Sequence, residues 1–400
     1  MSDLFARYRK LLARRDQLLG QGANPFGLRF DRLLSPTRAL VEGREVLLLG
    51  TNNYLGLTFD PACVEAALAA TRAYGTGTTG SRIANGTYDL HERLERALAD
   101  FYDRARCLVF TTGYQANLAT LAGLAGPGDR IFIDSHSHAS IYDGCLLSGA
   151  RIIRFRHNDA EDLERRLARH RGEEGIQLVV VEGLYSMLGD VAPLRELVAV
   201  VRRHGAWMVV DEAHSLGVYG ARGRGVAEEQ GVEAEVDVVV GTFSKSLGAV
   251  GGFAVSHHEG LELLRYAARP YMFTASPSPA TMASVTAAIQ RIRDDPSLRE
   301  RIWRNARALH AGLAELGLRL GADPGPVVAV VLPDEATAVA VWNHLLAHGL
   351  YVNLALPPGT PDRRSLLRLS VSAAHSEEEI ERAIAAFREL VRRFDLKSAA

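Results

Sequence analysis

Between about residue 107 and residue 256, short apolar runs alternate with stretches in which apolar residues recur every three or four positions. Runs that are apolar throughout are typical of strands covered on both faces, and the second pattern is typical of amphipathic helices. The predicted strands span residues 107–111, 130–134, 151–155, 177–182, 207–211, 236–241 and 252–256. The predicted helices span residues 114–124, 160–169, 193–204 and 259–268. This alternation predicts an α/β fold around a mostly parallel, seven-stranded sheet.

The pattern differs on either side of this region. The N-terminal side predicts a helix at 1–20 and a strand at 45–49, followed by the turn-rich loop 50–56. The C-terminal side predicts helices at 280–318, 336–348 and 376–394 and strands at 327–332, 351–354 and 365–370. We therefore expect an N-terminal helix and arm (1–46), a large α/β domain (47–277) and a smaller C-terminal α+β domain (278–400).

The composition is that of a globular protein in a reducing compartment. The chain has 400 residues, of which 47% are hydrophobic and 23% charged, and its net charge of −1 gives no positive field for nucleic acid or an anionic membrane. No run reaches the roughly eighteen apolar residues that span a bilayer, and the charged N-terminal stretch lacks the apolar core of a secretion signal. The three cysteines are widely spaced. We expect a cytoplasmic protein without an integral membrane segment.

One glycine-rich motif suggests a nucleotide site that its context does not support. Residues 75–80 (Gly-Thr-Gly-Thr-Thr-Gly) match the G-x-G-x-x-G pattern of dinucleotide-binding proteins. That fingerprint needs a strand before it and a helix opening from it, whereas residues 62–74 have a helical pattern. A glycine-rich active-site loop is therefore favoured over nicotinamide binding.

Lysine is rare in this chain and occupies only positions 10, 245 and 397. Lys245 lies in the segment Gly-Thr-Phe-Ser-Lys (241–245), between the apolar runs 236–240 and 250–255. The simple alternative is a solvated surface lysine. Burial between apolar runs would instead lower the pKa of the amine, which suits Schiff-base formation.

Three further motifs follow predicted strands. Residues 211–214 (Asp-Glu-Ala-His) end one strand, residues 111–117 (Thr-Thr-Gly-Tyr-Gln-Ala-Asn) lead from a strand into a helix, and residues 134–140 contain His136 and His138. Taken singly, Asp211 and Thr112 could be helix caps, and the histidine pair lacks a third metal ligand, so we predict no metal site. Because the carboxyl ends of parallel strands meet at one edge of a sheet, the motifs are expected to face a common ligand.

Pyridoxal 5'-phosphate (PLP) is the ligand that uses all of these groups. It needs a lysine for its aldehyde, an acid for its pyridine nitrogen and donors for its phosphate. Lys245 and Asp211 could serve the first two needs, and a histidine such as His138 could stack on the ring. The helix N-terminus at Gly113-Tyr114, with Thr242 and Ser244, could bind the phosphate.

These motifs resemble the α-oxoamine synthase family of fold-type I PLP enzymes, from the Asn-Asn-Tyr-Leu-Gly loop (52–56) to Leu-Arg-Leu-Ser (367–370). The segments 211–215 and 241–245 are the most specific. Within the family the chain is most similar to the soluble bacterial serine palmitoyltransferases. That similarity lies in residues 85–87, 137–144, 155–158, 185–190, 269–271 and 273–276.

The resemblance implies a role for each matching residue. Lys245 would bind the cofactor aldehyde and act as the catalytic base, and Asp211 and His214 would pair with the pyridine nitrogen and the ring hydroxyl. His138 would stack on the ring and, with these three, form the catalytic set. The further cofactor contacts would come from Gly113, Tyr114, Ser186, Thr242, Ser244 and, across a subunit boundary, Thr274.

The substrate residues implied by the resemblance are Arg368, for the amino-acid carboxylate, and Asn53 and Tyr54, which would line the site from a partner chain. A homodimer with shared active sites is therefore expected. The implied reaction is a decarboxylative condensation of serine, alanine or glycine with an acyl-CoA, giving an α-aminoketone, CoA and CO2. Leu356 stands where the serine palmitoyltransferases carry an arginine, which leaves the preferred amino acid open.

Two other functions remain as alternatives. One is 8-amino-7-oxononanoate synthase, or a family member of broad specificity. The other is a non-catalytic partner subunit, which would be expected to lack the lysine; the presence of Lys245, Asp211 and His214 argues against it.

Overall fold

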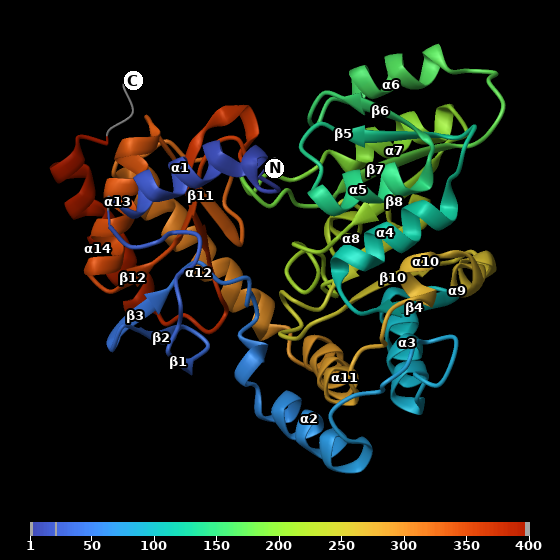
Figure 1. Cartoon of the computed structure of the whole chain (residues 1–400), viewed down its shortest axis with the longest axis horizontal. Coiled ribbons are helices and arrows are strands. Elements are labelled where there is room, and N and C mark those ends of the chain that lie inside the picture. The colour runs from blue at the N-terminus through green and yellow to red at the C-terminus, as the bar shows by residue number, and fades with distance from the viewer. Residues whose placement is uncertain (1–2, 21, 397–400) are drawn as a thin grey trace. The chain divides into compact units, whose positions relative to one another are not determined.

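The computed structural model describes residues 3–20 and 22–396 (Figure 1). These residues form two compact units. The larger unit contains residues 52–186 and 190–303, and the smaller contains the N-terminal residues up to Thr51, residues 187–189 and the chain from Arg304 onward.

The larger unit is built on a seven-stranded sheet. Its strands, in spatial order, are β4 (Arg106–Phe110), β10 (Gly252–Ser256), β9 (Val238–Thr242), β8 (Trp207–Asp211), β7 (Gln177–Glu182), β5 (Arg130–Asp134) and β6 (Arg151–Phe155). β10 runs antiparallel to β4 and β9, and the remaining neighbours are parallel. Most side chains of these strands are buried, as expected for a sheet covered on both faces. The predicted fold class is confirmed.

The helices of the larger unit connect and cover these strands. They are α2 (Pro61–Tyr74), α3 (Asp89–Tyr102), α4 (Gly113–Leu124), α5 (Ala139–Ser148), α6 (Ala160–Arg169), α7 (Leu194–Arg203) and α11 (Pro279–Asp294). Short turns complete the unit: η2 (Leu57–Phe59), α8 (Val226–Glu229), η3 (Glu233–Glu235), η4 (Glu259–Leu263), α9 (Leu264–Ala267) and α10 (Arg269–Met272). The sequence analysis did not predict α3 and α5.

The helical region predicted at 280–318 is two helices. α11 ends at Asp294, and α12 (Ser297–Glu315) starts just after Pro296, a residue that lacks the N–H a helix interior needs. α11 packs against α2 and α3 and so belongs to the larger unit, although the sequence analysis placed it in the C-terminal domain. The division between the units falls inside α12, and the N-terminal boundary falls at residue 51.

The smaller unit contains two sheets. One has the order β1 (Arg32–Ser35), β2 (Arg38–Val41), β3 (Arg44–Leu48) and β12 (Leu350–Tyr351). The other has the order β11 (Val327–Leu332), β14 (Ser365–Ser370) and β13 (Asn353–Ala355). Its helices are η1 (Ala6–Tyr8), α1 (Arg9–Leu19), α13 (Glu335–Ala347), η5 (Pro361–Arg363) and α14 (Glu377–Phe394). Trp342 and Phe387 lie in its apolar core.

Candidate active site

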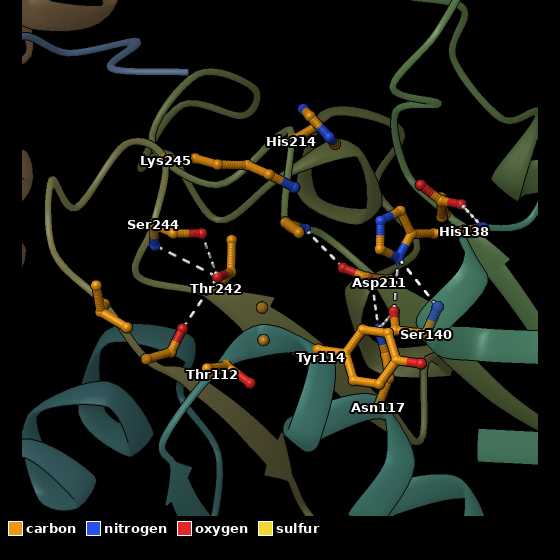
Figure 2. Close-up of a pocket in the computed structure, with 16 residues that line it drawn as sticks. Thr112, Tyr114, Asn117, His138, Ser140, Asp211, His214, Thr242, Ser244 and Lys245 are labelled. Atoms are coloured by element: carbon orange, nitrogen blue, oxygen red, sulfur yellow. Dashed lines mark hydrogen bonds between the residues drawn. The ribbon is translucent and has the colours of Figure 1, made fainter. Parts of the chain in front are cut away.

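The parallel strands bring the predicted motifs together around one cavity of about 270 Å³ in the larger unit (Figure 2). β8 and β9 run in the same direction, so the residues that follow them emerge at the same edge of the sheet. Eight of the predicted residues line this cavity: Gly113, Tyr114, His138, Asp211, His214, Thr242, Ser244 and Lys245.

Asp211 is the last residue of β8 and lies at the floor of the cavity, with 6% of its surface exposed. Its carboxylate accepts two hydrogen bonds, from the Asn117 side-chain amide (2.7 Å) and from the backbone N–H of Ala213 (2.9 Å). Donors on both oxygens fix the direction of the carboxylate. A carboxylate held in this way can pair with a protonated pyridine nitrogen.

His138 caps the N-terminus of α5, and its ring borders the same cavity. The side-chain amide of Asn117 donates to the Ser140 hydroxyl (2.9 Å), so that hydroxyl can donate to His138 Nδ1 at 2.7 Å. The backbone N–H of Ser140 also donates to Nδ1 (3.2 Å). Burial, together with the positive charge of Lys245, lowers the pKa of His138 despite the opposing charge of Asp211. The ring is therefore neutral and carries its proton on Nε2.

A cradle for an anionic group lies at the start of α4. Thr112 caps this helix by accepting a hydrogen bond from the backbone N–H of Gln115 (3.1 Å), and the N–H groups of the first turn have no partner inside the helix. The hydroxyls of Thr242 and Ser244 lie 2.8 Å apart beside it. A Cβ on Gly113 would come within 2.7 Å of the Thr242 side chain, so only glycine allows this approach. Helix N-termini with hydroxyl donors bind phosphate.

Lys245 follows β9, and its side chain extends into the space bordered by His214, Asp211 and Thr242 (Figure 2). The residue is half-buried, whereas the sequence analysis expected burial between the two apolar runs. Its positive charge acts on both His138 and Glu182. The amine of Lys245 thus borders the same cavity as the Asp211 carboxylate, where a Schiff-base lysine would meet the cofactor.

Tyr54, which was predicted to line a partner chain's site, contacts His214 of its own chain. Its side chain is fully buried, and a 2.7 Å hydrogen bond joins its hydroxyl to His214 Nδ1 of the same chain. Within its own chain the loop 52–56 thus brings Tyr54 to His214, and its predicted place in a partner chain's site stays a prediction. Asn53, next to it, donates from its side-chain amide to the Thr58 hydroxyl (2.8 Å) and is 8% exposed.

The other predicted residues lie outside the lining of this cavity. Thr274 accepts a hydrogen bond from the Gln115 side chain (3.2 Å), and Ser186 lies in the loop after β7. Arg368 is a buried residue of β14 in the smaller unit, where it donates to the Ser370 hydroxyl (2.9 Å). Their roles toward cofactor and substrate stay predictions.

Among the lining residues that were given no role by the sequence analysis, three have polar side chains: Asn117, Ser140 and Glu182. Asn117 lies one helical turn after Gly113, in the motif 111–117, and that spacing could have indicated it. Glu182 is an acid at the end of an apolar strand, which is the same signal that identified Asp211. Ser140 is recognisable only from its contacts with Asn117 and His138.

These residues fit PLP group by group. The amine of Lys245 suits the aldehyde, and the carboxylate of Asp211, which accepts two hydrogen bonds, suits the pyridine nitrogen. The cradle at the start of α4, with the close approach of Gly113 to Thr242, suits the phosphate. The neutral imidazole of His138 offers a flat face for the ring.

Residues 44–387 match the family described as aminotransferase class I and II, and the chain belongs to that family. The chain is 56% identical to a serine palmitoyltransferase of Caulobacter vibrioides (92% of this chain, 91% of the relative) and 49% identical to that of Sphingomonas paucimobilis (96% and 92%). It is 43% identical to an 8-amino-7-oxononanoate synthase of Geobacter sulfurreducens (88% and 90%).

Solved structures agree with these relatives. A serine palmitoyltransferase with a PLP internal aldimine superposes with a TM-score of 0.97 at 48% identity, covering 99% of this chain and 100% of that one. A Sphingomonas wittichii serine palmitoyltransferase gives a TM-score of 0.97 at 49% identity, with the same coverage. The chain is a fold-type I PLP-dependent transferase, and PLP is its cofactor.

Within residues 3–20 and 22–396, none of the helices combines the length and the apolar character that a bilayer crossing requires.

Proposed function

We propose that this chain is a serine palmitoyltransferase-like enzyme of the cytoplasm. It condenses a small L-amino acid, serine first, with a long-chain acyl-CoA and releases CoA, CO2 and an α-aminoketone. The observation that carries the proposal is the set of Lys245, Asp211 and His138 around one cavity with an anion cradle, in a chain 56% identical to the Caulobacter vibrioides enzyme.

When bound, PLP supplies a protonated ring that accepts the electron pair left on the amino acid's Cα. Each residue of the chain has a definite part in that chemistry. Asp211 holds the proton on the pyridine nitrogen, because its carboxylate is fixed and charged. Lys245 takes the Cα proton on Nζ. His138, neutral and anchored, orients the reactants, and orientation is what selects which bond to Cα breaks.

The choice of amino acid depends on the smaller unit. Arg368 is the proposed carboxylate-binding residue. Leu356 is 7% exposed and belongs to the apolar core of that unit, so it offers no charge to a substrate. Arg368 alone would then bind the carboxylate, which makes alanine and glycine candidates beside serine.

A homodimer is part of the proposal. Four large apolar side chains of the larger unit are more than 60% exposed: Val250 (62%), Leu263 (67%), Tyr266 (71%) and Phe273 (70%). Val250 also lines the cavity. Exposed apolar groups beside a site favour an interface with a second copy, from which Thr274 could reach the cofactor phosphate. Sedimentation equilibrium of the PLP-loaded protein tests this, and a monomer at micromolar concentration would contradict it.

The decisive test is an assay of thiol and CO2 release over a matrix of serine, alanine and glycine against acyl-CoAs of short and long chain. We expect the highest kcat/KM for serine with a long-chain acyl-CoA. The Lys245→Ala variant should lack both turnover and the absorbance of imine-bound PLP at about 420 nm. Preference for alanine with a short dicarboxylic acyl thioester would instead identify an 8-amino-7-oxononanoate synthase. A Lys245→Ala variant that kept turnover would overturn the mechanism.

A further inference from the structure

Glu182 is a buried acid of the cavity wall that the mechanism above does not use. It is the last residue of β7, next to Asp211 in the parallel register of β7 and β8, and only 4% of its surface is exposed. The backbone N–H of His138 donates to Glu182 Oε1 at 2.6 Å. This short contact joins the end of β7 to the residue that caps α5.

Glu182 and Asp211 accept different numbers of hydrogen bonds, and this difference decides which of the two carboxyl groups carries the negative charge. Both carboxylate oxygens of Asp211 accept hydrogen bonds, from Asn117 and from Ala213. Glu182 is buried as well and accepts its hydrogen bond from the backbone N–H of His138. Two neighbouring buried carboxyl groups do not both ionise readily, so the negative charge falls on the group with more donors.

The titration of Glu182 agrees with this division. Burial and the negative charges of Asp211 and Asp134 raise its pKa to about 8, although the His138 N–H and the Lys245 charge act in the opposite direction. Glu182 is therefore protonated at neutral pH, and a protonated carboxyl still accepts a hydrogen bond through its carbonyl oxygen.

The position of the His138 ring depends on two anchors. Ser140, itself held by Asn117, fixes Nδ1 of the ring. Glu182 fixes the backbone of His138 by accepting a hydrogen bond from its N–H. Loss of the second anchor frees the N-terminus of α5 to shift, and the imidazole shifts with it.

We propose that Glu182 is a positioning residue: its carboxyl holds the His138 backbone, and so the imidazole, against the cofactor ring, and leaves the negative charge at the pyridine nitrogen to Asp211. This role rests on PLP occupying the cavity, as in the proposed function. The relevant form of Glu182 is a neutral hydrogen-bond acceptor, so a glutamine should replace it and an alanine should not.

The test compares Glu182→Gln and Glu182→Ala with the wild type. PLP affinity is measured by fluorescence titration of the cofactor-free protein, and kcat and KM with the reconstituted enzyme. Glu174→Gln, which removes an exposed carboxylate from the same unit, is the matched control. At pH 7 we expect Glu182→Gln to stay within about 3-fold of the wild type. We expect Glu182→Ala to lose about 10-fold or more in PLP affinity and in kcat, the size of one lost buried hydrogen bond.

A pH profile separates positioning from a merely structural role. The PLP affinity of the wild type should show a step near pH 8 that Glu182→Gln lacks and Glu174→Gln keeps. If Glu182→Ala does not fold, Glu182→Gln and its pH profile still decide the question. The proposal would be overturned if Glu182→Gln were as impaired as Glu182→Ala. It would also be overturned if Glu182→Ala bound PLP and turned over like the wild type. Wild-type protein that binds no PLP would instead overturn the proposed function.

Discussion

His157 is held between two carboxylates, and this arrangement predicts a specific loss of stability at alkaline pH. Its Nδ1 donates to Asp134 (2.8 Å) and its Nε2 to Asp190 (2.6 Å), while its ring stacks on His136 with centroids 3.8 Å apart. Burial disfavours the charged imidazolium, but the hydrogen bonds and charges of the two aspartates outweigh it and raise the pKa of His157 to about 9. The clamp ties Asp134 at the end of β5 to Asp190 in the loop between β7 and α7.

The magnitude follows from the two pKa values. The ordinary pKa of histidine is 6.5, and the difference from about 9 corresponds to about 3 kcal/mol. Because the folded state binds this proton more tightly than the unfolded state, the contribution is fully present below pH 6.5. It is lost as the pH rises through about 9. The His157 side chain is 19% exposed, so solvent screens the clamp only in part.

The assay is urea unfolding of PLP-saturated wild type and His157→Gln between pH 6 and pH 9.5. Fluorescence is informative because two of the tryptophans, Trp207 and Trp303, lie in the same unit as the clamp. The free energy of unfolding of the wild type should exceed that of the variant by about 3 kcal/mol more at pH 6 than at pH 9.5.

The control is His310→Gln, in the smaller unit, whose ring bonds a backbone carbonyl oxygen rather than a carboxylate. Its difference from the wild type should not vary over this range. A His157→Gln difference that is equally large at pH 6 and pH 9.5 would refute the reasoning, since the stabilisation would then not come from the imidazolium.

Three further substitutions test the site and its support. Asn117→Ala removes the donor shared by Asp211 and Ser140 and should weaken PLP binding about 10-fold or more, measured by titration of the cofactor-free protein. Gly113→Ala places a Cβ within 2.7 Å of Thr242 and should weaken binding of PLP more than that of pyridoxal, which has no phosphate. Burial raises the pKa of Glu212 to about 7, against the hydrogen bonds of Ser215 and of two backbone N–H groups. The contribution of Glu212 to the stability of the wild type should therefore fall by about 3 kcal/mol as the pH rises from 4.5 to 7, so the free energy of unfolding of the wild type should fall by that amount relative to Glu212→Gln in urea unfolding. If the free energies of unfolding of the wild type and of Glu212→Gln changed equally with pH, Glu212 would be excluded as the source of the loss.

The strands of the larger unit were the most predictable part of the fold. β5, β6, β7, β8 and β10 have the predicted bounds, because strands covered on both faces leave short apolar runs that end abruptly. β1 and β2 were missed, since each has only four residues and most of their side chains are exposed or only partly buried. The location of α11 depends on its packing against α2 and α3, a tertiary contact that local pattern does not encode.

The candidate site was predictable where one residue carries the chemistry. Lys245, Asp211 and His138 were identified from residue type and place at strand ends, and all three line the cavity. Asn117, Ser140 and Glu182 act on other residues, through hydrogen bonds that join different elements. Motif spacing and strand-end position could have indicated Asn117 and Glu182, but the groups that these residues bond become visible only when the strands are aligned in space.

The division of the chain into two units has an evolutionary consequence. The eight predicted residues that line the cofactor cavity belong to the larger unit, whereas Leu356 and Arg368, the positions expected to govern the amino acid, belong to the smaller one. This prediction implies that mutations in the smaller unit change which amino acid is accepted while the residues of the cofactor cavity stay as they are. Under the same prediction, a lineage explores new substrates without passing through an inactive ancestor.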